Sequence, residues 1–376
     1  MRDVLRYGPI FALLLLGSLG PQNRVLAGEA KRGWEVEWER TLQAAKKEGE
    51  VVLYATEGSE QIYREFEKKY PEIKVTSVLG RGSQIAQKVM GERRAGKYLA
   101  DIYLGGSGTA YNIFYEGKIL DSLKSVLVLP EVVDESKWWS GKHIYHDDES
   151  QYVLAFSAVA QSYFSYNTKV VNPKEFSSYW DFLNPKWRGK IVSYDPTMGG
   201  AVSGALMFFY HQPKLGPEFI RRLLSETDLT PTRDSHQLVD WLAVGKFSIA
   251  AMVPPDRVGV YDAKSKGLPV DAFHAAAFKE GAPLSTANGN MALFNRAPHP
   301  NAAKVAINWL LSREGQIVYQ KIELDGESLR MDIPKDQVIP RIRRVKGAEY
   351  LMLAGPGFKN MDQIEQLVKE SWKRKK

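Results

Sequence analysis

Three serines, Ser59, Ser83 and Ser107, stand where an apolar segment gives way to the start of an expected helix. In a parallel sheet all such turns lie along the carboxyl edge of the strands, so the helix N-termini that follow them point into one crevice. Free N–H groups and hydroxyls at helix N-termini can hold an anion or a polar oxygen. The same serines would also serve as ordinary helix caps, and their spacing leaves both roles open.

Two further polar turns repeat this arrangement later in the chain. Thr197 stands in the glycine-bearing turn 195–200, which follows an apolar segment at 191–194. Thr286 lies in the polar stretch 285–290, where the chain is expected to return to its first half. Two α/β halves whose polar edges face each other form a cleft, and such a cleft suits the capture of a small solute.

Alternating strands and helices position these turns. Continuous apolar runs are typical of strands covered on both faces, and helices with one apolar face are expected between them. One such run lies at 51–55, and further strands are expected at 73–79, 101–104, 191–194 and 247–253. Late in the chain, 301–311 and 314–321 are expected to form paired helices. This alternation indicates an α/β fold with right-handed crossovers.

No local motif for catalysis or metal binding accompanies the expected cleft. The sequence has no Walker A loop, no dinucleotide-binding glycine fingerprint, no Gly-x-Ser-x-Gly elbow and no His-Glu-x-x-His. Cysteine is absent, which excludes disulfides, thiolate zinc sites and cysteine nucleophiles. The cluster at 143–148, with His143 and His146, has a spacing that fits no established metal signature. We therefore expect no catalytic residues, no metal and no cofactor.

Composition and the N-terminal segment predict an exported protein. The 376 residues carry a formal net charge of +7, which permits an anionic ligand but does not call for nucleic acid. Residues 1–27 have the three parts of a secretory signal: Arg2 and Arg6, the apolar run 10–16, and small residues before a cleavage site. That run is too short to span a membrane. We expect cleavage after Ala27 and a periplasmic monomer.

Four stretches carry a resemblance to a known family. They are the strand opening at 49–54, the helix-to-strand passage at 66–75, the third strand with its follow-on at 100–120, and the late helices at 297–316. In their order and spacing they resemble the periplasmic solute-binding proteins of ABC importers. The likeness is greater to the subgroup that includes ferric-ion-binding proteins, and it covers most of residues 40–325.

The resemblance implies a type II two-lobe α/β fold, in which each lobe is a mainly parallel sheet flanked by helices and the ligand cleft lies between the lobes. Lobe one would hold residues 28–155 and 275–340, and lobe two residues 156–274. Residues 341–376 would form a C-terminal helical segment that packs on lobe two. Ligand binding would favour lobe closure, and the closed form would be presented to an inner-membrane permease.

The sequence departs from the ferric pattern at one place. Ferric binders that resemble it carry adjacent tyrosines just after the strand that matches 247–253, whereas this chain has Pro254-Pro255-Asp256-Arg257. Hard ferric iron needs several anionic oxygens, and Glu57 after the first strand would supply one. Arg257 would repel a bare cation and suit a carboxylate, phosphonate or phosphate ester. The alternative for Arg257 is a surface residue on the first turn of a helix.

The expected ligand is a small organic anion, or a zwitterion if Glu57 meets an amine on the same molecule. Iron or an iron chelate is the alternative ligand. A secreted enzyme, or a receptor that serves a membrane partner other than a permease, is the alternative function. The residues expected to line the ligand site are Thr56, Glu57, Ser59, Ser83, Ser107, Thr197, Asp256, Arg257 and Thr286.

Overall fold

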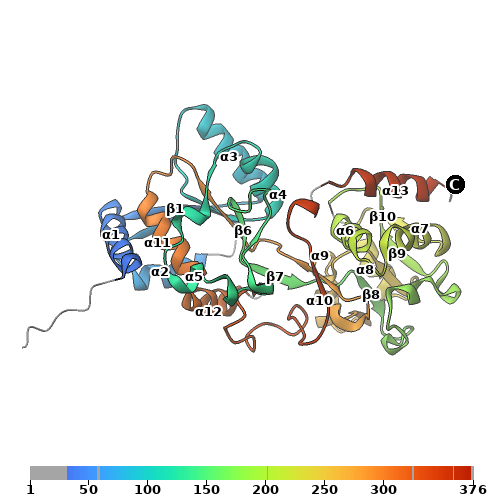
Figure 1. Cartoon of the computed structure of the whole chain (residues 1–376). Coiled ribbons are helices and arrows are strands. Elements are labelled where there is room, and N and C mark those ends of the chain that lie inside the picture. The colour runs from blue at the N-terminus through green and yellow to red at the C-terminus, as the bar shows by residue number, and fades with distance from the viewer. Residues whose placement is uncertain (1–31, 57–59, 201, 324–325, 359, 374–376) are drawn as a thin grey trace, which may run out of the picture.

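The computed structural model describes residues 32–56, 60–200, 202–323, 326–358 and 360–373. Within these ranges the chain forms two lobes, each built on its own sheet, and a smaller sheet joins them (Figure 1). The expected signal segment 1–27 and the expected site residues Glu57 and Ser59 lie outside the described residues. No helix in the described part of the chain is long and apolar enough to cross a membrane.

Lobe one is built on a seven-stranded sheet in the order β2-β1-β3-β14-β6-β5, with β4 beside β14. Its strands are β1 (Glu50–Ala55), β2 (Lys74–Leu79), β3 (Ile102–Gly105), β4 (Leu120–Asp121), β5 (Ile144–Tyr145), β6 (Val153–Ala155) and β14 (Asn290–Phe294). The first three strands are parallel, as expected. The returning strand β14 runs antiparallel to both β3 and β6, so the sheet is mixed rather than mainly parallel.

Helices cover both faces of this sheet because successive strand residues alternate sides. Leu53 packs in a core with Phe66 and Trp309, whereas Tyr54 packs on the other face with Phe114. The helices are α1 (Gly33–Glu48), α2 (Glu60–Lys69), α3 (Gly82–Arg94), α4 (Ser107–Thr109) with its continuation Ala110–Tyr115, α5 (Pro130–Val133), α11 (Pro300–Leu311) and α12 (Arg313–Ile322). Single-turn helices lie at Leu123–Val126, Glu135–Lys137 and Trp139–Gly141.

Lobe two repeats the plan on a five-stranded sheet in the order β10-β9-β11-β8-β12. Its strands are β8 (Phe164–Asn167), β9 (Ile191–Tyr194), β10 (Thr230–Thr232), β11 (Ile249–Ala251) and β12 (Val270–Ala272). Its helices are α6 (Ser203–His211), α7 (Gly216–Glu226), α8 (Ser235–Ala243), α9 (Pro255–Val258) and α10 (Val260–Ser265). Single-turn helices lie at Pro173–Glu175, Tyr179–Leu183, Pro185–Trp187 and Ala275–Ala277. The strand β8 is antiparallel to its neighbours, so this sheet is mixed as well.

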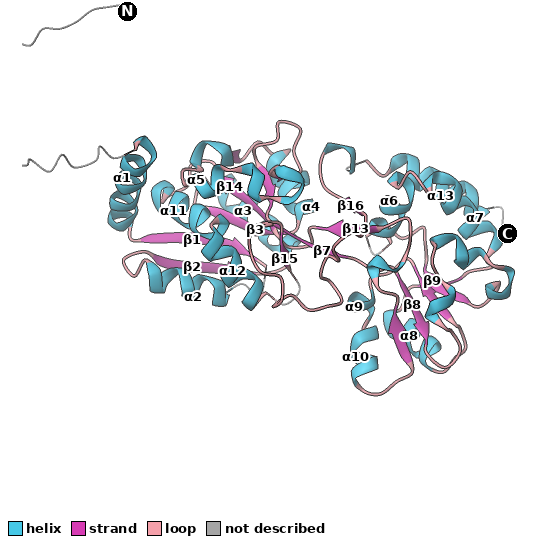
Figure 2. Ribbon diagram, turned by 60° about the horizontal axis from the view of Figure 1, so that its bottom comes forward, coloured by secondary structure: helices cyan, strands magenta, loops and turns pink. Residues whose placement is uncertain are grey.

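The joining sheet has the order β15-β7-β13-β16 and lies between the two larger sheets (Figure 2). The chain enters lobe two after β7 (Ser157–Ala160), returns along β13 (Ala282–Ser285), forms β15 (Glu327–Ser328), and crosses again at β16 (Tyr350–Met352). After a turn at Pro356–Phe358, helix α13 (Asp362–Lys373) packs against α7 of lobe two. The C-terminal segment, expected to be helical, therefore contains a strand that bridges the lobes.

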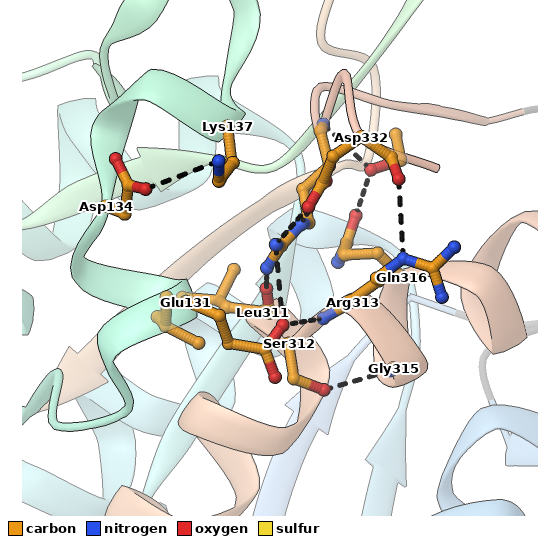
Figure 3. A network of polar contacts seen from close by, with 12 residues as sticks. Glu131, Asp134, Lys137, Leu311, Ser312, Arg313, Gly315, Gln316 and Asp332 are labelled. Atoms are coloured by element: carbon orange, nitrogen blue, oxygen red, sulfur yellow. Dashed lines mark hydrogen bonds and ion pairs between the residues drawn. The ribbon is translucent and has the colours of Figure 1, made fainter. Parts of the chain in front are cut away.

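A buried arginine fastens the segment after β15 to lobe one. The Arg330 side chain is fully buried, and its guanidinium donates to Asp332 at 2.8 and 2.9 Å and to the Leu311 carbonyl at 3.0 Å. Glu131 of α5 lies 3.4 Å away, and Figure 3 shows how these partners surround the network. A buried charge is tolerated when it is paired in this way, so this part of the segment is fixed.

A candidate ligand-binding cleft between the lobes

Polar turns from both lobes line one cavity of 730 Å³, which we call the interlobe cavity. Lobe one contributes the first turns of α3 and α4, lobe two contributes the start of α6 and Arg257 on the short helix α9, and the loop 285–288 forms the floor. A neighbouring cavity of 360 Å³, the hinge cavity, shares Thr56, Thr286, Ala287 and Asn288 with it. The two cavities are therefore compartments of a single cleft.

The structure brings together most of the described residues that the sequence placed at the site. Thr56, Ser83, Ser107, Arg257 and Thr286 line the interlobe cavity. Asp256 lines the hinge cavity, which Thr56 and Thr286 also border.

Thr197 lines neither compartment, although it was expected in the cleft. Its hydroxyl donates to Asp195 Oδ1 at 2.6 Å, and its N–H donates to the same oxygen at 3.0 Å. These bonds hold Thr197 within its own turn, where it borders a separate cavity beside α13. Gly200 and Ser203, farther along the same connection, reach the interlobe cavity instead.

Ser83 and Ser107 are not the caps of their helices. The cap positions are Arg81 before α3 and Gly106 before α4, and the serines are the second and first helical residues. Neither hydroxyl forms a hydrogen bond with another described residue. Since the first N–H groups of a helix have no partner within it, each turn offers donors to the cavity.

Close packing holds the two serine turns together. A methyl group on Gly82 would collide with the Thr109 side chain, so α3 and α4 touch at their first turns. A methyl group on Gly106 would lie 3.8 Å from Asn288 Oδ1, which places the floor loop against the second turn. A larger residue at position 82 would therefore force the Thr109 side chain to move.

The floor of the cleft rests on a buried network. Thr286 Oγ1 lies 3.4 Å from His146 Nε2, and this nitrogen lies 2.9 Å from Asn290 Oδ1. The amide of Asn290 donates to the carbonyls of Gly105 at 2.9 Å and Ala287 at 3.0 Å. His146 therefore links the floor loop to β14, and Asn290 links it to β3. Ala287 has φ +43°, a left-handed conformation that costs a non-glycine residue about 1–3 kcal/mol and is common at binding sites.

His143 and Asp147 of the 143–148 cluster also form hydrogen bonds within the fold. His143 Nε2 lies 3.0 Å from the Val132 carbonyl of α5. Asp147 accepts the N–H groups of three residues in the loop at 151–153. Among the residues that the structure describes, no three histidine, aspartate or glutamate side chains gather as metal ligands.

Charge is distributed unevenly between the two compartments. Arg257 is the one charged side chain among the described residues that line the interlobe cavity. It is exposed and forms no ion pair within the described part of the chain. The hinge cavity is bordered by Asp256, Glu323 and Arg341, and the Arg341 guanidinium lies 5.0 Å from the Tyr261 ring.

Burial, and secondarily the negative charge of Asp256, changes the titration of the cleft tyrosines. Both raise the pKa of Tyr261 to about 12 and the pKa of Tyr163 still further. Tyr261 borders the hinge cavity and Tyr163 the interlobe cavity. Both phenols are therefore protonated at neutral pH in the metal-free protein.

Sequence reasoning missed the C-terminal residues that reach the cleft. Arg341 borders the hinge cavity, and Leu353, Phe358 and Met361 border the interlobe cavity. They follow the other site residues at a long distance in the chain, and no local pattern marks them. The strand β16 brings them to the cleft by pairing with β13.

The fold is also found in solved structures of low sequence identity. FutA of Trichodesmium, solved with iron and citrate, is 17% identical and covers 87% of this chain and 98% of its own, with a TM-score of 0.59. Ferric iron-binding protein A of Mannheimia haemolytica, in an open conformation, is 14% identical, with coverages of 87% and 99% and a TM-score of 0.63. AfuA of Actinobacillus pleuropneumoniae, with fructose-6-phosphate bound, is 17% identical, with coverages of 86% and 97% and a TM-score of 0.53.

These similarities agree with the two-lobe fold and with the resemblance found in the sequence. They show the fold alone, since the identities are low and the bound ligands differ. A sequence model of bacterial extracellular solute-binding proteins matches residues 54–317, which is more than half of the chain. The chain therefore belongs to the bacterial extracellular solute-binding protein family, the solute-binding components of ABC transporters.

Proposed function

We propose that this protein binds a small organic anion or zwitterion in the interlobe cavity and delivers it to an inner-membrane ABC permease. The observation that carries the proposal is the position of Arg257. Its guanidinium is exposed, has no counter-ion among the described residues, and is the one charge on the described lining of that cavity. Guanidinium groups bind carboxylates and phosphates with paired hydrogen bonds.

Lobe one offers the matching donors. Ser83 and Ser107 stand at the first turns of their helices, and their hydroxyls form no hydrogen bond with any residue that the structure describes. Hydrogen bonds to a charged group contribute about 1.5–3 kcal/mol each. A few such contacts, together with exclusion of water on closure, would supply the approximately −8 kcal/mol that micromolar binding requires.

The hinge cavity supports a zwitterionic ligand, because it offers a carboxylate close to Arg257. Asp256 borders the hinge cavity, and within the described part of the chain its carboxylate accepts one long hydrogen bond, from Gln161 at 3.4 Å. An ammonium group on the ligand would meet Asp256 while the anionic group meets Arg257, because Thr56 and Thr286 border both compartments. Glu57, to which the sequence assigned this role, lies outside the described residues.

Export to the periplasm is part of the same proposal. Its support is the tripartite pattern of residues 1–27 and the extracellular family to which the chain belongs. We expect the native protein to begin at Gly28. Mass spectrometry of a periplasmic extract checks this, and a chain that retains Met1 would contradict it.

The direct test is calorimetric titration of organic anions into wild type and Arg257→Ala. We expect Arg257→Ala to weaken binding by at least about tenfold, or about 1.4 kcal/mol, with little change in apo stability. Arg188→Ala is the matched control, because it removes an exposed arginine of lobe two that borders neither compartment. Equal dissociation constants for wild type and Arg257→Ala, or preference for a neutral sugar, would refute the anion proposal. Consumption of a bound compound would instead point to an enzyme.

An iron chelate is the second candidate ligand. FutA, which has the same fold, was solved with iron and citrate. A citrate chelate presents carboxylates, which suit Arg257 better than a bare ferric ion does. In this form the metal would be carried as cargo, without protein tyrosinates.

A further inference from the structure

The interlobe cavity has one apolar side that the anion contacts do not use. Met207 of α6, together with Leu353, Phe358 and Met361 of the C-terminal segment, borders the cavity. We call these four side chains the apolar wall. Met207 is buried, and the other three are half-buried.

The apolar wall is a fixed part of lobe two. The N–H of Leu353 donates to the Leu284 carbonyl of β13 at 2.9 Å. The Phe358 ring lies 4.9 Å from the His211 ring of α6, at an interplanar angle of 62°. Helix α13, which follows directly, buries Ile364 and Val368 in the core of lobe two. The wall is therefore held by β13 before it and by α6 and α13 of lobe two.

Across the interlobe cavity, the described part of lobe one presents no large apolar side chain to the wall. The described residues of lobe one that border the same cavity are glycines, serines and threonines: Thr56, Gly82, Ser83, Gly106, Ser107, Gly108 and Thr109. Apolar surface gains about 25 cal/mol per Å² when it leaves water, but serine and threonine turns that covered it would lose the hydration of their own polar groups. Among the described residues of lobe one that border this cavity, the wall therefore has no apolar partner, and an apolar part of the ligand would supply one.

We infer that the ligand is an amphipathic organic anion, whose charged group meets Arg257 and whose aromatic ring or branched alkyl group packs on the apolar wall. This inference rests on the proposed function, because Arg257 supplies the anchor. The 730 Å³ of the cavity leaves room for such a body beside the anionic group. A sugar phosphate would place its hydroxyl groups against the apolar wall, and inorganic phosphate would leave the wall in water. Both therefore suit the cavity less well than an amphipathic anion does.

The test uses a series that keeps the anion and varies the apolar body: methylphosphonate, butylphosphonate and phenylphosphonate, titrated calorimetrically into the full mature chain. We expect wild type to bind phenylphosphonate about tenfold more tightly than methylphosphonate, as burial of a ring predicts. Leu353→Ala and Phe358→Ala should bring this ratio close to one. Arg257→Ala should weaken every member of the series and leave the ratio unchanged.

Leu183→Ala is the matched control for the wall. Leu183 is a half-buried leucine packed on the same lobe-two core, and it borders neither compartment. It should keep the wild-type ratio. Thermal unfolding shows which variants are folded, and Met361→Ala replaces Phe358→Ala if the latter is not.

The outcomes separate the two proposals. Equal affinity across the series in wild type would overturn the apolar wall as a ligand contact and leave the anion proposal standing. If benzyl alcohol bound as tightly as phenylphosphonate, and if Arg257→Ala bound phenylphosphonate as tightly as wild type, the anion proposal would be wrong. The amphipathic-anion inference would then be wrong as well, because it depends on Arg257 as the contact for the charged group. Absence of saturable binding for every probe would count against both.

Discussion

At the scale of single residues, two arginines show that surroundings decide what a side chain can do. Arg330 is fully buried, and Asp332, Glu131 and the Leu311 carbonyl use its donors. Arg257 is exposed and has no ion pair with any described residue. The first can only stabilise the fold, whereas the second has its donors available for a ligand.

The cleft tyrosines lead to a prediction about iron. Because Asp256 and Arg257 stand where the ferric binders that this sequence resembles carry adjacent tyrosines, we expect ferric citrate to bind without forming a tyrosinate. Titration of ferric citrate into the apo protein should produce no visible tyrosinate charge-transfer band. A stoichiometric band that Tyr261→Phe removes would contradict this, provided that Tyr98→Phe, outside both compartments, retains it.

His143 leads to a prediction about pH. Burial lowers the pKa of this imidazole from its ordinary value of 6.5. The unfolded chain therefore binds a proton more readily than the folded chain between the folded-state pKa and 6.5. The contribution of His143 to the free energy of unfolding is therefore fully present above pH 6.5 and decreases as the pH drops through this window, by at most about 1.4 kcal/mol per pH unit.

Urea unfolding at a series of pH values measures this dependence. His143→Gln should reduce the slope below pH 6.5, whereas His236→Gln, which changes an exposed histidine of α8, should leave it unchanged. A slope that is identical in wild type and His143→Gln would assign the pH dependence to other groups.

At the scale of elements, the first turns of α3 and α4 must stay in register for Ser83 and Ser107 to face one ligand. Their contact depends on Gly82, where any side chain would collide with Thr109. The same helix has a second glycine, Gly91, with nothing near its missing side chain. Replacing each glycine by alanine therefore separates two effects, because both substitutions change helix propensity and only the one at Gly82 disturbs close packing.

Gly82→Ala should separate the two turns and weaken anion binding by about tenfold, the equivalent of one lost charge-assisted hydrogen bond. Gly91→Ala should leave binding unchanged and raise the free energy of unfolding by about 0.5–1 kcal/mol, because alanine is the better helix former. Calorimetry and urea unfolding of both variants check this. Unchanged affinity in Gly82→Ala would show that the contact does not position the site.

At the scale of the whole molecule, three strands of the joining sheet carry the chain between the lobes, at β7, β13 and β16. The proposed contacts of the ligand lie on both sides, with Arg257 on lobe two and Ser83 and Ser107 on lobe one. A ligand that bridges two bodies in this way stabilises the arrangement in which they are closest.

We therefore expect the radius of gyration to fall when wild type is saturated with the tightest-binding phosphonate of the series. Small-angle scattering with and without ligand measures this change. Arg188→Ala should show the same decrease, and Arg257→Ala should show it only at higher ligand concentration. Superimposable scattering curves at saturation would show that binding does not close the lobes.

The sequence by itself predicted the features that depend on local pattern. The segments 51–55, 73–79 and 101–104 match β1, β2 and β3 closely. The run at 51–55 is continuous and apolar because β1 lies inside the sheet, whereas the edge strand β2 mixes apolar and polar residues. The same strands placed Ser83 and Ser107 at one sheet edge, where both line the interlobe cavity. The absence of a tyrosine pair before Arg257 was likewise visible in the chain. Such features involve residues a few positions apart.

Only the tertiary structure decided which side chains of the later segments face the cleft. Thr197 was expected there, but Asp195 holds it in its own turn and Ser203 borders the cavity instead. Arg341, Leu353 and Phe358 carry no local signal, and they reach the cleft because β16 pairs with β13 across the joining sheet. The direction of β14 was fixed in the same way, by pairing with β3 and β6. These outcomes depend on hydrogen bonds and packing between residues far apart in the chain, which a local pattern does not encode.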